Sequence, residues 1–282
     1  MATTTYEYVP GNFAHDDEEQ SPLAAVPHRF GLKDESKDRW TILFQQLSDL
    51  NNGSPHNVSY KFFLLSRHGQ GYHNLAESKY GTDAWDDHWS KLNGDGEIIW
   101  GPDPLLTPLG KDQAEAIGRE WAKEAAAGLP PPHRRYCSPL SRALDTCDIM
   151  FDGAFEDHSH AVLIVENCRE ENGVHTCDQR NLRSYIAKHK PHFEFEEAFT
   201  EFDELWSPNI RETKAELTLR ARGVIERIFE TNPEATFISI TAHGGFITGF
   251  LKAIGRKLYT VPTGGVIPVI VRAVISPAHD FL

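Results

Sequence analysis

Two histidines that each follow an apolar segment are the residues best suited to chemistry in this chain. Arg67 and His68 come directly after the apolar run 60–66. His243 comes directly after a second such run, 236–242. Runs of this kind are typical of buried strands, and the glycines after each histidine favour tight turns. Ligands bind beyond the carboxyl ends of strands in open α/β folds, so an arginine beside a nucleophilic ring there predicts a phosphate site.

A second arginine and a carboxylic acid would complete such a site. Ser138 and Pro139 predict that a helix begins there, because serine is a good N-cap and proline suits the first helical position. Arg142 then lies in or near the first turn, where free N–H groups and the helix dipole favour an anion. Glu170 follows the apolar run 161–165 and is expected on a loop, where it could donate a proton.

At these residues the chain resembles the histidine phosphatase superfamily, in its phosphoglycerate-mutase-like branch. The resemblance covers roughly residues 58–276 and rests on segments in the family's order: LSRHG at 65–69 with Asn74, Asp103, LTPLG at 106–110 with Gln113 and Ala114, SPL at 138–140 with Arg142, Ala143 and Thr146, and AHGG at 242–245. The segment REENGVHTCD at 169–178 is similar to the form found in fungal and plant phosphomutase-like members.

The resemblance implies a role for each matching residue. His68 matches the nucleophile that takes up the phosphoryl group as a phosphohistidine, and Glu170 matches the acid that protonates the leaving oxygen. The residues that match the phosphate ligands are Arg67, Asn74, Arg142 and His243, and His243 also counts with the catalytic residues.

Two positions of the first motif depart from the family pattern. Gln70 and Gly71 stand where many members carry Glu and a small hydroxyl residue, and this affects the phosphate contacts expected of the loop. Glu171 adjoins Glu170, so either carboxyl group could face the site.

The chemistry of phosphoryl transfer explains why these residue types belong together. A neutral imidazole is a nucleophile, and its covalent adduct splits one difficult substitution into two easier ones. Guanidinium groups fit the phosphoryl oxygens bidentately and stabilise their charge. A carboxylic acid with a raised pKa can protonate the leaving oxygen, which contributes about two to four powers of ten in rate. Arginine and histidine supply the positive charge, so neither a metal ion nor another cofactor is expected.

Three further residues are candidates for contact with the substrate: His73, His175 and Arg180. The two histidines lie near motif residues in the sequence. Asp178 is expected to cap a helix that continues through Lys188. Arg180 and Arg183 on that helix would either meet a second anionic group of the substrate or lie solvated at the surface.

Composition indicates a soluble globular protein, and the resemblance implies a small phosphorylated substrate. The 282 residues carry a net charge of −13, which argues against a nucleic-acid partner. No apolar run is long enough to span a membrane, and residues 1–8 lack the basic and apolar regions of a secretory signal, so a cytoplasmic location is expected. The four cysteines lack the tight spacing of metal ligands.

Strand and helix patterns alternate after residue 57, which predicts an α/β fold with a mostly parallel central sheet. The resemblance implies a three-layer α/β/α sandwich. Long helices are expected at 107–127 and 212–230, and a final strand at 266–275. We expect an irregular N-terminal arm at 1–57, with one helical stretch near 38–50. A single α/β domain at 58–282 follows, with insertions over the site at about 75–106 and 178–210.

The first insertion contains four large aromatic residues, Tyr80, Trp85, Trp89 and Trp100. Segments of this length in compact domains are usually functional or disordered. The insertion is therefore either a lid whose aromatic side chains shape the substrate pocket or an appendage with its own small core.

Together these features predict a phosphatase that hydrolyses a small phosphorylated metabolite through a phosphohistidine on His68. A phosphoglycerate-type mutase, which returns the phosphoryl group to the substrate, is the alternative among enzymes. A regulator that binds phosphate without catalysis is the alternative outside them, although the complete catalytic set is present.

Overall fold

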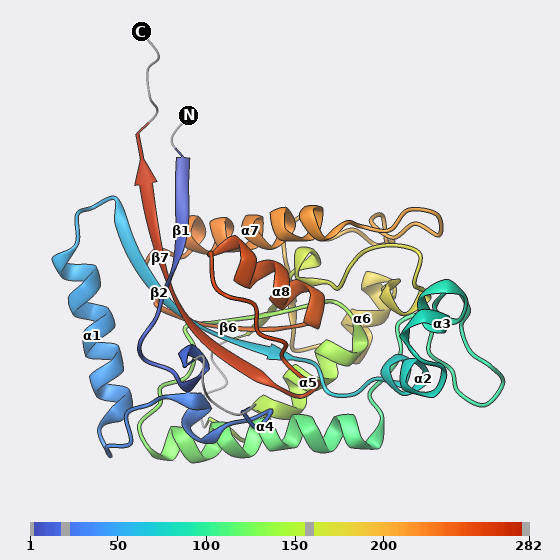
Figure 1. Ribbon diagram of the computed structural model, residues 1–282, viewed down its shortest axis with the longest axis horizontal. Coiled ribbons are helices and arrows are strands. Elements are labelled where there is room, and N and C mark those ends of the chain that lie inside the picture. Colours follow the sequence, from blue (N-terminus) through green and yellow to red (C-terminus); the bar gives the residue numbers. More distant parts are fainter. Residues whose placement is uncertain (1–2, 18–22, 156–160, 278–282) are drawn as a thin grey trace, which may run out of the picture.

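The computed structural model describes residues 3–17, 23–155 and 161–277, and within them seven strands form one sheet (Figure 1). The strands lie in the order β1-β7-β2-β6-β3-β4-β5. Their bounds are β1 Thr3–Val9, β2 Val58–Arg67, β3 Arg134–Cys137, β4 Val162–Ile164, β5 Glu194–Phe195, β6 Phe237–Ala242 and β7 Val266–Ser276. The pairs from β2 through β6, β3 and β4 to β5 are parallel, whereas β7 is antiparallel to both β1 and β2. This mostly parallel sheet confirms the predicted fold class.

Helices cover both faces of the sheet, so the molecule has the expected three layers (Figure 1). The α-helices in the described residues are α1 Arg39–Gly53, α2 Tyr72–Tyr80, α3 Thr82–Asp87, α4 Pro108–Ala126, α5 Ser141–Phe151, α6 Arg183–His189, α7 Lys214–Thr231 and α8 Gly244–Ala253. Helices α7 and α8 pack on one face, and α1, α4 and α5 pack on the other.

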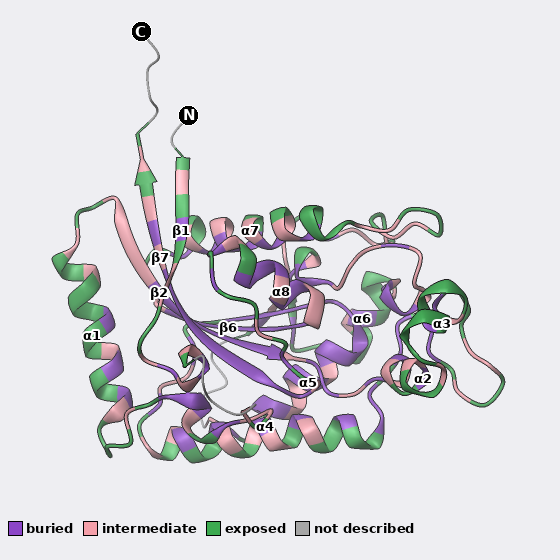
Figure 2. Cartoon of the chain, viewed as in Figure 1, coloured by how far each residue is buried: buried purple, intermediate pink, exposed green. Residues whose placement is uncertain are grey.

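The central strand β2 contributes to the core on both faces because successive side chains of a strand point in opposite directions. Phe62 packs with the cluster that includes Trp40 of α1 and Trp121 of α4. Its neighbour Phe63 packs with the cluster that includes Phe250 of α8. Figure 2 shows the resulting distribution: the strands of the sheet are largely buried, and the outer helices expose one side. A strand covered on both faces reads as a continuous apolar run, which is why the sequence pattern located it.

The two long helices have the termini that the sequence indicates. Thr107 caps α4 through its side chain, which accepts a hydrogen bond from the Gly110 amide at 3.1 Å, and Pro108 is the first helical residue. Thr213 and Glu216 form a capping box at the start of α7. Both helices agree with their predicted positions within two residues.

The prediction of an irregular arm at 1–57 is wrong for its first segment, whereas the helical stretch expected near 38–50 is confirmed. Residues 3–9 form the edge strand β1, paired with β7, and residues 39–53 form α1, which begins and ends close to the expected helical stretch. Strand β1 lacks an apolar run because it lies at the edge of the sheet, where only Tyr6 is buried. A strand with this little burial has no strong sequence pattern.

Two helices begin later in the structure than the sequence predicts. Helix α5 begins at Ser141 rather than at Ser138, because the backbone of Leu140 is still extended and the Ser138 hydroxyl is engaged elsewhere. Arg142 nevertheless lies in the first turn. Asp178 is the last residue of a short 3-10 helix, Thr176–Asp178, and α6 begins only at Arg183. Asp178 is therefore not a helix cap.

The aromatic insertion has a core of its own. Trp85 and Trp100 are buried together with Ala76 and Cys177, and Tyr80 stacks on Trp89 with ring centroids 4.0 Å apart. The indole of Trp100 donates a hydrogen bond to the Leu92 carbonyl at 2.7 Å. Cys177 comes from the 3-10 helix Thr176–Asp178, just before the second insertion, so that segment also contributes to this cluster. The aromatic side chains therefore serve packing, which is the second of the two interpretations of this segment.

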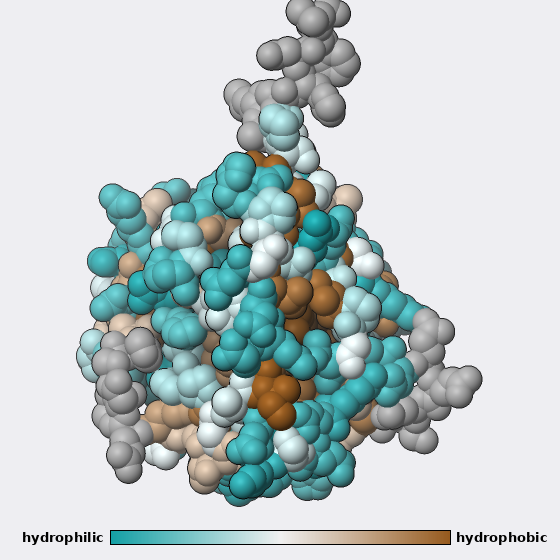
Figure 3. Space-filling model, turned by 90° about the vertical axis from the view of Figure 1, so that its left-hand side faces the viewer, coloured by the Kyte–Doolittle hydropathy of each residue, from teal (hydrophilic) through white to brown (hydrophobic). Residues whose placement is uncertain are grey.

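The end of the molecule that carries α1 is mainly hydrophilic. Figure 3 shows this face, on which a few hydrophobic side chains lie among hydrophilic ones. Within residues 3–17, 23–155 and 161–277, no helix has the length and apolar character needed to cross a bilayer.

Candidate active site

The register of the parallel strands brings the two predicted histidines to one edge of the sheet. Arg67 at the end of β2 pairs with Ala242 at the end of β6. The amide of His68 continues the ladder by donating to the Ala242 carbonyl at 3.0 Å. The rings of His68 and His243 consequently lie with their centroids 5.0 Å apart. This edge also carries the end of β3, where the Ser138 amide donates to the Thr241 carbonyl at 3.0 Å.

The hydrogen bonds of His68 define which ring nitrogen can act as a nucleophile. Its Nδ1 lies 2.6 Å from the Gly69 carbonyl oxygen, which can only accept, so Nδ1 carries the proton. The Nε2 atom of a neutral imidazole then has a lone pair. Arg142 donates its Nε–H toward that atom at 3.3 Å. The lone pair of His68 therefore faces a guanidinium group. An anionic phosphoryl group would be attracted to the same place.

Arg142 is completely buried and is held by a carboxylate that the sequence did not identify. Its two terminal nitrogens donate to the Asp178 carboxylate at 2.8 Å and to the Cys177 carbonyl at 2.7 Å. Asp178 is itself buried and accepts a second ion pair, at 2.9 Å, from Arg211. Burial of both charges is tolerated because each is paired and hydrogen-bonded. Asp178 thus fixes the orientation of Arg142 beside His68.

His243 and Arg67 complete the group of positive and ring side chains. The Nε2 atom of His243 lies 2.7 Å from the Ser138 hydroxyl, so this serine orients the ring instead of capping α5. Arg67 donates to the Val261 carbonyl at 2.9 Å. It lies across the start of α8, where a Cβ on Gly244 would be only 3.2 Å from the Arg67 Cζ atom. Glycine at this position lets the guanidinium approach the helix backbone.

Three buried imidazoles are kept neutral by their surroundings. Burial is the largest cause that lowers the pKa of His68, His73 and His243, and the charges of Arg142 and Arg67 lower it further. A neutral ring is the nucleophilic form. The environment therefore keeps His68 in its reactive state at neutral pH.

Glu170, rather than Glu171, has the properties of a proton donor. Burial raises the pKa of Glu170, and the nearby charge of Asp178 raises it further. One oxygen accepts the Gly245 amide at 3.0 Å, which places the carboxyl group at the start of α8 beside Arg67. Glu171 instead forms ion pairs with Lys214 and Arg211. A carboxyl group with a raised pKa keeps its proton closer to neutral pH, as a general acid must.

Two arginines fix the loop that carries Glu170. Arg220 donates to the carbonyls of Arg169 and Glu170, each at 2.9 Å. Arg169 has no exposed surface and pairs with Asp203 and Glu166. These contacts join residues from separate loops and α7, and no local sequence pattern indicates them.

The loop after His68 is shaped by close packing against α4. A Cβ atom on Gly69 would overlap the Gly110 backbone, and one on Gly110 would overlap the Gln70 backbone. The Gln70 side chain accepts the Thr107 hydroxyl at 2.8 Å, so this departure from the family pattern is used in packing. Asn74 accepts the Gly71 amide at 3.1 Å and so supports the turn before α2.

The three candidate substrate residues have different surroundings. His73 is buried with its ring centroid 5.5 Å from that of His68, so the structure brings it to the site. His175 packs edge-on against Trp85 and lies 3.6 Å from an Asp86 oxygen, so it contacts the first insertion. Arg180 neither lies at the surface nor points a free guanidinium toward a substrate, so both interpretations of this residue are wrong. Its buried guanidinium pairs with Glu166 and donates to the carbonyls of residues 200–202. Arg180 therefore stabilises the second insertion.

His175, Cys177 and Asp178 form one group, among the described residues, whose ligand atoms lie within 4.8 Å of one another. Both oxygens of Asp178 already pair with arginines, Arg142 and Arg211. Burial also raises the pKa of the Cys177 thiol well above its usual value, which disfavours the thiolate that metals require. The donor set does not suit a cation.

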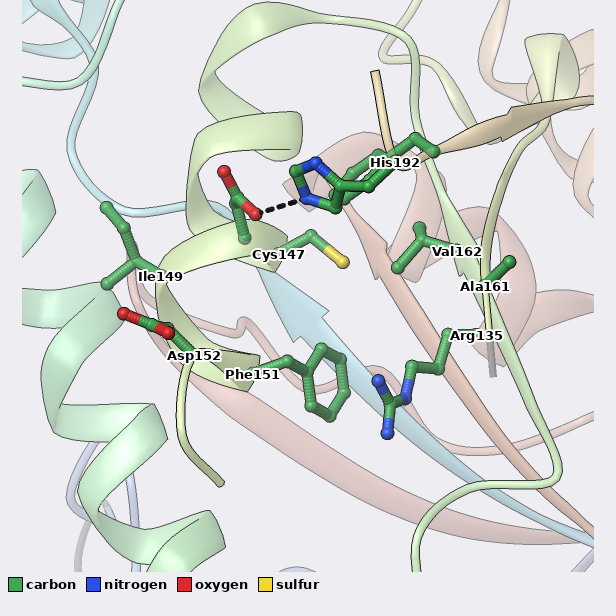
Figure 4. A pocket seen from close by; sticks show the side chains of 10 residues that line it. Arg135, Cys147, Ile149, Phe151, Asp152, Ala161, Val162 and His192 are labelled. Atoms are coloured by element: carbon green, nitrogen blue, oxygen red, sulfur yellow. Dashed lines mark hydrogen bonds and ion pairs between the residues drawn. The ribbon is translucent and has the colours of Figure 1, made fainter. Parts of the chain in front are cut away.

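A cavity of about 580 Å³ lies away from these residues (Figure 4). Arg135 and Phe151 lie side by side in it, and His192 pairs with Asp148 at 2.8 Å near its rim. It opens beside Arg135 and Val162, near the amino ends of β3 and β4. The catalytic candidates follow the carboxyl ends of the strands, so this cavity is separate from the site.

Comparison with known proteins identifies the same segments. The family model described as the histidine phosphatase superfamily (branch 1) matches residues 63–261. A probable phosphoglycerate mutase of Arthroderma benhamiae is 38% identical over 95% of this chain and 84% of its own length. A probable phosphoglycerate mutase of Saccharomyces cerevisiae is 34% identical over 91% of this chain and 98% of its own length.

The fold also occurs among solved structures. The ecdysone phosphate phosphatase of Bombix mori, in complex with tungstate, has a TM-score of 0.50 and 16% identity, with 74% of this chain and 88% of that chain covered. At this identity the similarity concerns the fold alone.

Proposed function

Because the chain belongs to the histidine phosphatase superfamily, branch 1, we propose that it hydrolyses a small phosphorylated metabolite through a phosphohistidine on His68. The observation that carries this proposal is the arrangement of His68. Its neutral Nε2 atom faces the guanidinium of Arg142, and the ring of His243 lies beside it. A nucleophile, two cationic groups and a carboxyl group with a raised pKa are the parts that phosphoryl transfer requires.

The proposed reaction has two steps. The Nε2 lone pair of His68 attacks phosphorus, the bond from phosphorus to the leaving oxygen breaks, and Glu170 transfers its proton to that oxygen. A water molecule then attacks the phosphohistidine, its proton returns to the Glu170 carboxylate, and the nitrogen–phosphorus bond breaks. Arg67, Arg142 and His243 bind the phosphoryl oxygens in both steps. Asn74, at the adjoining turn, is proposed as a further ligand. Since these side chains neutralise the charge, the proposed mechanism requires no metal ion.

Replacement of the nucleophile tests this proposal. We expect His68→Ala to abolish hydrolysis of p-nitrophenyl phosphate, because the variant lacks the Nε2 atom that is proposed to attack phosphorus. Mass spectrometry after brief incubation with substrate should detect one added phosphoryl group on the wild-type protein and none on the variant. The exposed His189 of α6 is a matched control, and His189→Ala should retain activity. Substantial activity in a folded His68→Ala protein contradicts the mechanism.

The role of Glu170 is tested by the leaving group. An alkyl phosphate needs a proton on its leaving oxygen far more than p-nitrophenyl phosphate does, because an alkoxide is much the stronger base. Glu170→Gln should therefore lower kcat/KM for glycerol 3-phosphate by about 100-fold or more, and for the aryl ester much less. Steady-state kinetics on both substrates measure the difference. Equal losses would assign the proton to another group, and Glu171→Gln is the matched comparison.

A mutase is the second candidate, and two observations favour it. The relatives are named probable phosphoglycerate mutases, and only 1% of the surface of His68 is exposed. A phosphohistidine shielded from water can return its phosphoryl group to the substrate. Incubation with 3-phosphoglycerate distinguishes the reactions: the hydrolase releases inorganic phosphate, whereas the mutase forms the 2-phospho isomer without net release.

A further inference from the structure

The cavity at the amino ends of β3 and β4 has the size of a ligand site (Figure 4). Its volume of about 580 Å³ lies within the range of about 300–1,000 Å³ that is typical of sites for small organic ligands. Its walls come from the second half of α5, the first residues of β3 and β4, and residues 192–193 before β5.

Apolar side chains from these separate elements form much of the inner wall. Phe151 of α5, Val162 of β4 and Phe193 are all buried and line the cavity. Figure 4 shows the Val162 side chain directed toward the Cys147 side chain of α5. Walls of this kind favour a ligand with an apolar body, because its surface is removed from water on binding.

The guanidinium of Arg135 is built into this apolar wall. Only 7% of the residue is exposed, and its Cζ atom lies 4.4 Å from the centre of the Phe151 ring. Figure 4 shows the two side chains next to each other at the cavity. A guanidinium that stacks on a ring by its face carries its N–H donors along its edges, in a fork that matches a carboxylate. Its attraction to an anion is stronger here than at a fully hydrated surface.

The two acidic residues that line the cavity do not cancel this charge. Asp148 pairs with Lys190 at 2.6 Å and with His192 at 2.8 Å. Asp152 is exposed at the end of α5, and Figure 4 shows its carboxylate directed away from Arg135. The lining carboxylates are therefore engaged elsewhere or turned away.

We propose that this cavity is a second ligand site, which binds an amphipathic monocarboxylate. The carboxylate pairs with Arg135, and the apolar chain or ring lies against Val162 and Phe193. A monoanion suits the cavity better than a phosphate ester, because the lining residues include one arginine, whereas the catalytic candidates include two. The inference is independent of the proposed reaction, since no lining residue belongs to the catalytic candidates.

Calorimetric titration of the whole chain with 4-phenylbutyrate and with octanoate tests this site. We expect one saturable site for at least one of the two acids. Neutral 4-phenylbutyramide should bind about tenfold more weakly than 4-phenylbutyrate, because it forms no charged pair with Arg135. Arg135→Met should weaken binding of the acid by about tenfold or more for the same reason. The neighbouring Arg134 is exposed and does not line the cavity, so Arg134→Met is the matched control and should bind the acid as the wild type does.

A second variant tests the cavity without removing the charge. Val162→Phe places a larger side chain in the space and keeps Arg135, so it should also weaken binding. Thermal melting and hydrolysis of p-nitrophenyl phosphate show whether each variant is folded, because neither residue belongs to the proposed catalytic machinery. If Arg135→Met does not fold, Val162→Phe decides the question.

Each outcome supports or overturns the inference. Weaker binding in Arg135→Met and in Val162→Phe, with unchanged binding in Arg134→Met, supports it. The absence of saturable binding for both acids overturns it, as does equal affinity for the acid and its amide. Orthovanadate is an analogue of phosphate, so displacement of the acid by orthovanadate would place the acid at the catalytic site and would also overturn the inference.

Discussion

Asp178 links the two halves of the proposed chemistry. Its carboxylate pairs with Arg142, which faces the nucleophile, and with Arg211, which also donates to the carbonyls of Glu171 and Gly173. The charge of Asp178 also raises the pKa of Glu170. One buried carboxylate thus orients Arg142 and favours the protonated form of Glu170. We regard it as a positioning residue, because it acts through these two side chains.

Asp178→Asn should change the pH profile as well as the rate. Loss of the negative charge lowers the pKa of Glu170, so the acid loses its proton at a lower pH. The alkaline limb of kcat/KM for glycerol 3-phosphate should therefore move toward acid. The rate itself should fall about tenfold or more, because Arg142 loses an ion pair in a buried site. Kinetics across the pH range measure both effects.

A control separates this electrostatic effect from simple loosening of the loop. Glu212 pairs with Arg220, which holds the backbone at Glu170, whereas the charges that most affect the pKa of Glu170 belong to Asp178, Glu171 and Arg67. Glu212→Gln should lower the stability of the protein without moving the alkaline limb of the pH profile. If the alkaline limb of Asp178→Asn lies at the same pH as that of the wild type, the charge of Asp178 does not control the pKa of Glu170.

The contact between the loop after β2 and the start of α4 decides where His68 lies. Gly69 and Gly110 meet without side chains, and the Gly69 amide donates to the Thr146 hydroxyl of α5 at 3.0 Å. Helices α4 and α5 therefore both hold the loop. Close packing of this kind leaves no room for a methyl group.

Gly110→Ala should reduce activity although alanine favours helices. The added Cβ would overlap the Gln70 backbone and displace the loop that carries His68, so we expect kcat to fall at least tenfold. On α7, a Cβ added at Gly223 would have no atom within 4 Å outside its own helix backbone. Gly223→Ala is the matched control and should stabilise the protein by about 0.5–1 kcal/mol. Kinetics and thermal melting check both variants, and an active Gly110→Ala enzyme would show that the loop can adapt.

Burial of neutral histidines makes the stability of the folded protein depend on pH. Besides the three site histidines, His15 is buried near Tyr259, and burial lowers its pKa to about 4. In the unfolded chain a histidine has a pKa of about 6.5, so the unfolded state binds protons first as the pH falls. The stabilisation that comes from keeping these histidines neutral is therefore present above about pH 6.5 and is lost as the pH falls.

The contribution of His15 can be isolated. Its stabilisation is lost between about pH 6.5 and its folded pKa of about 4, which amounts to about 2 kcal/mol at pH 5. His15→Gln does not titrate, so its Tm should fall less between pH 7 and pH 5 than that of the wild type. Calorimetry at the two pH values measures the difference. Identical falls in Tm would show that His15 is not kept neutral by the fold.

Local patterns were sufficient for the order of the main elements and for most catalytic candidates. Apolar runs located β2 and β6, and Thr107 with Pro108 located α4, because burial on both faces and helix capping depend on neighbouring residues. The motif segments identified His68 and His243 for the same reason: each is attached directly to the end of its strand.

Only the tertiary structure decided which charged groups meet. Arg142 and Asp178 are separated by 36 positions and lie on different elements, yet they form a buried ion pair. Arg180 has the sequence context of a surface residue but is enclosed by Glu166 and the carbonyls of the second insertion. Hydrophobicity and capping act over a few residues, whereas the partner of a buried charge depends on how distant loops pack. That packing is not encoded in any short segment.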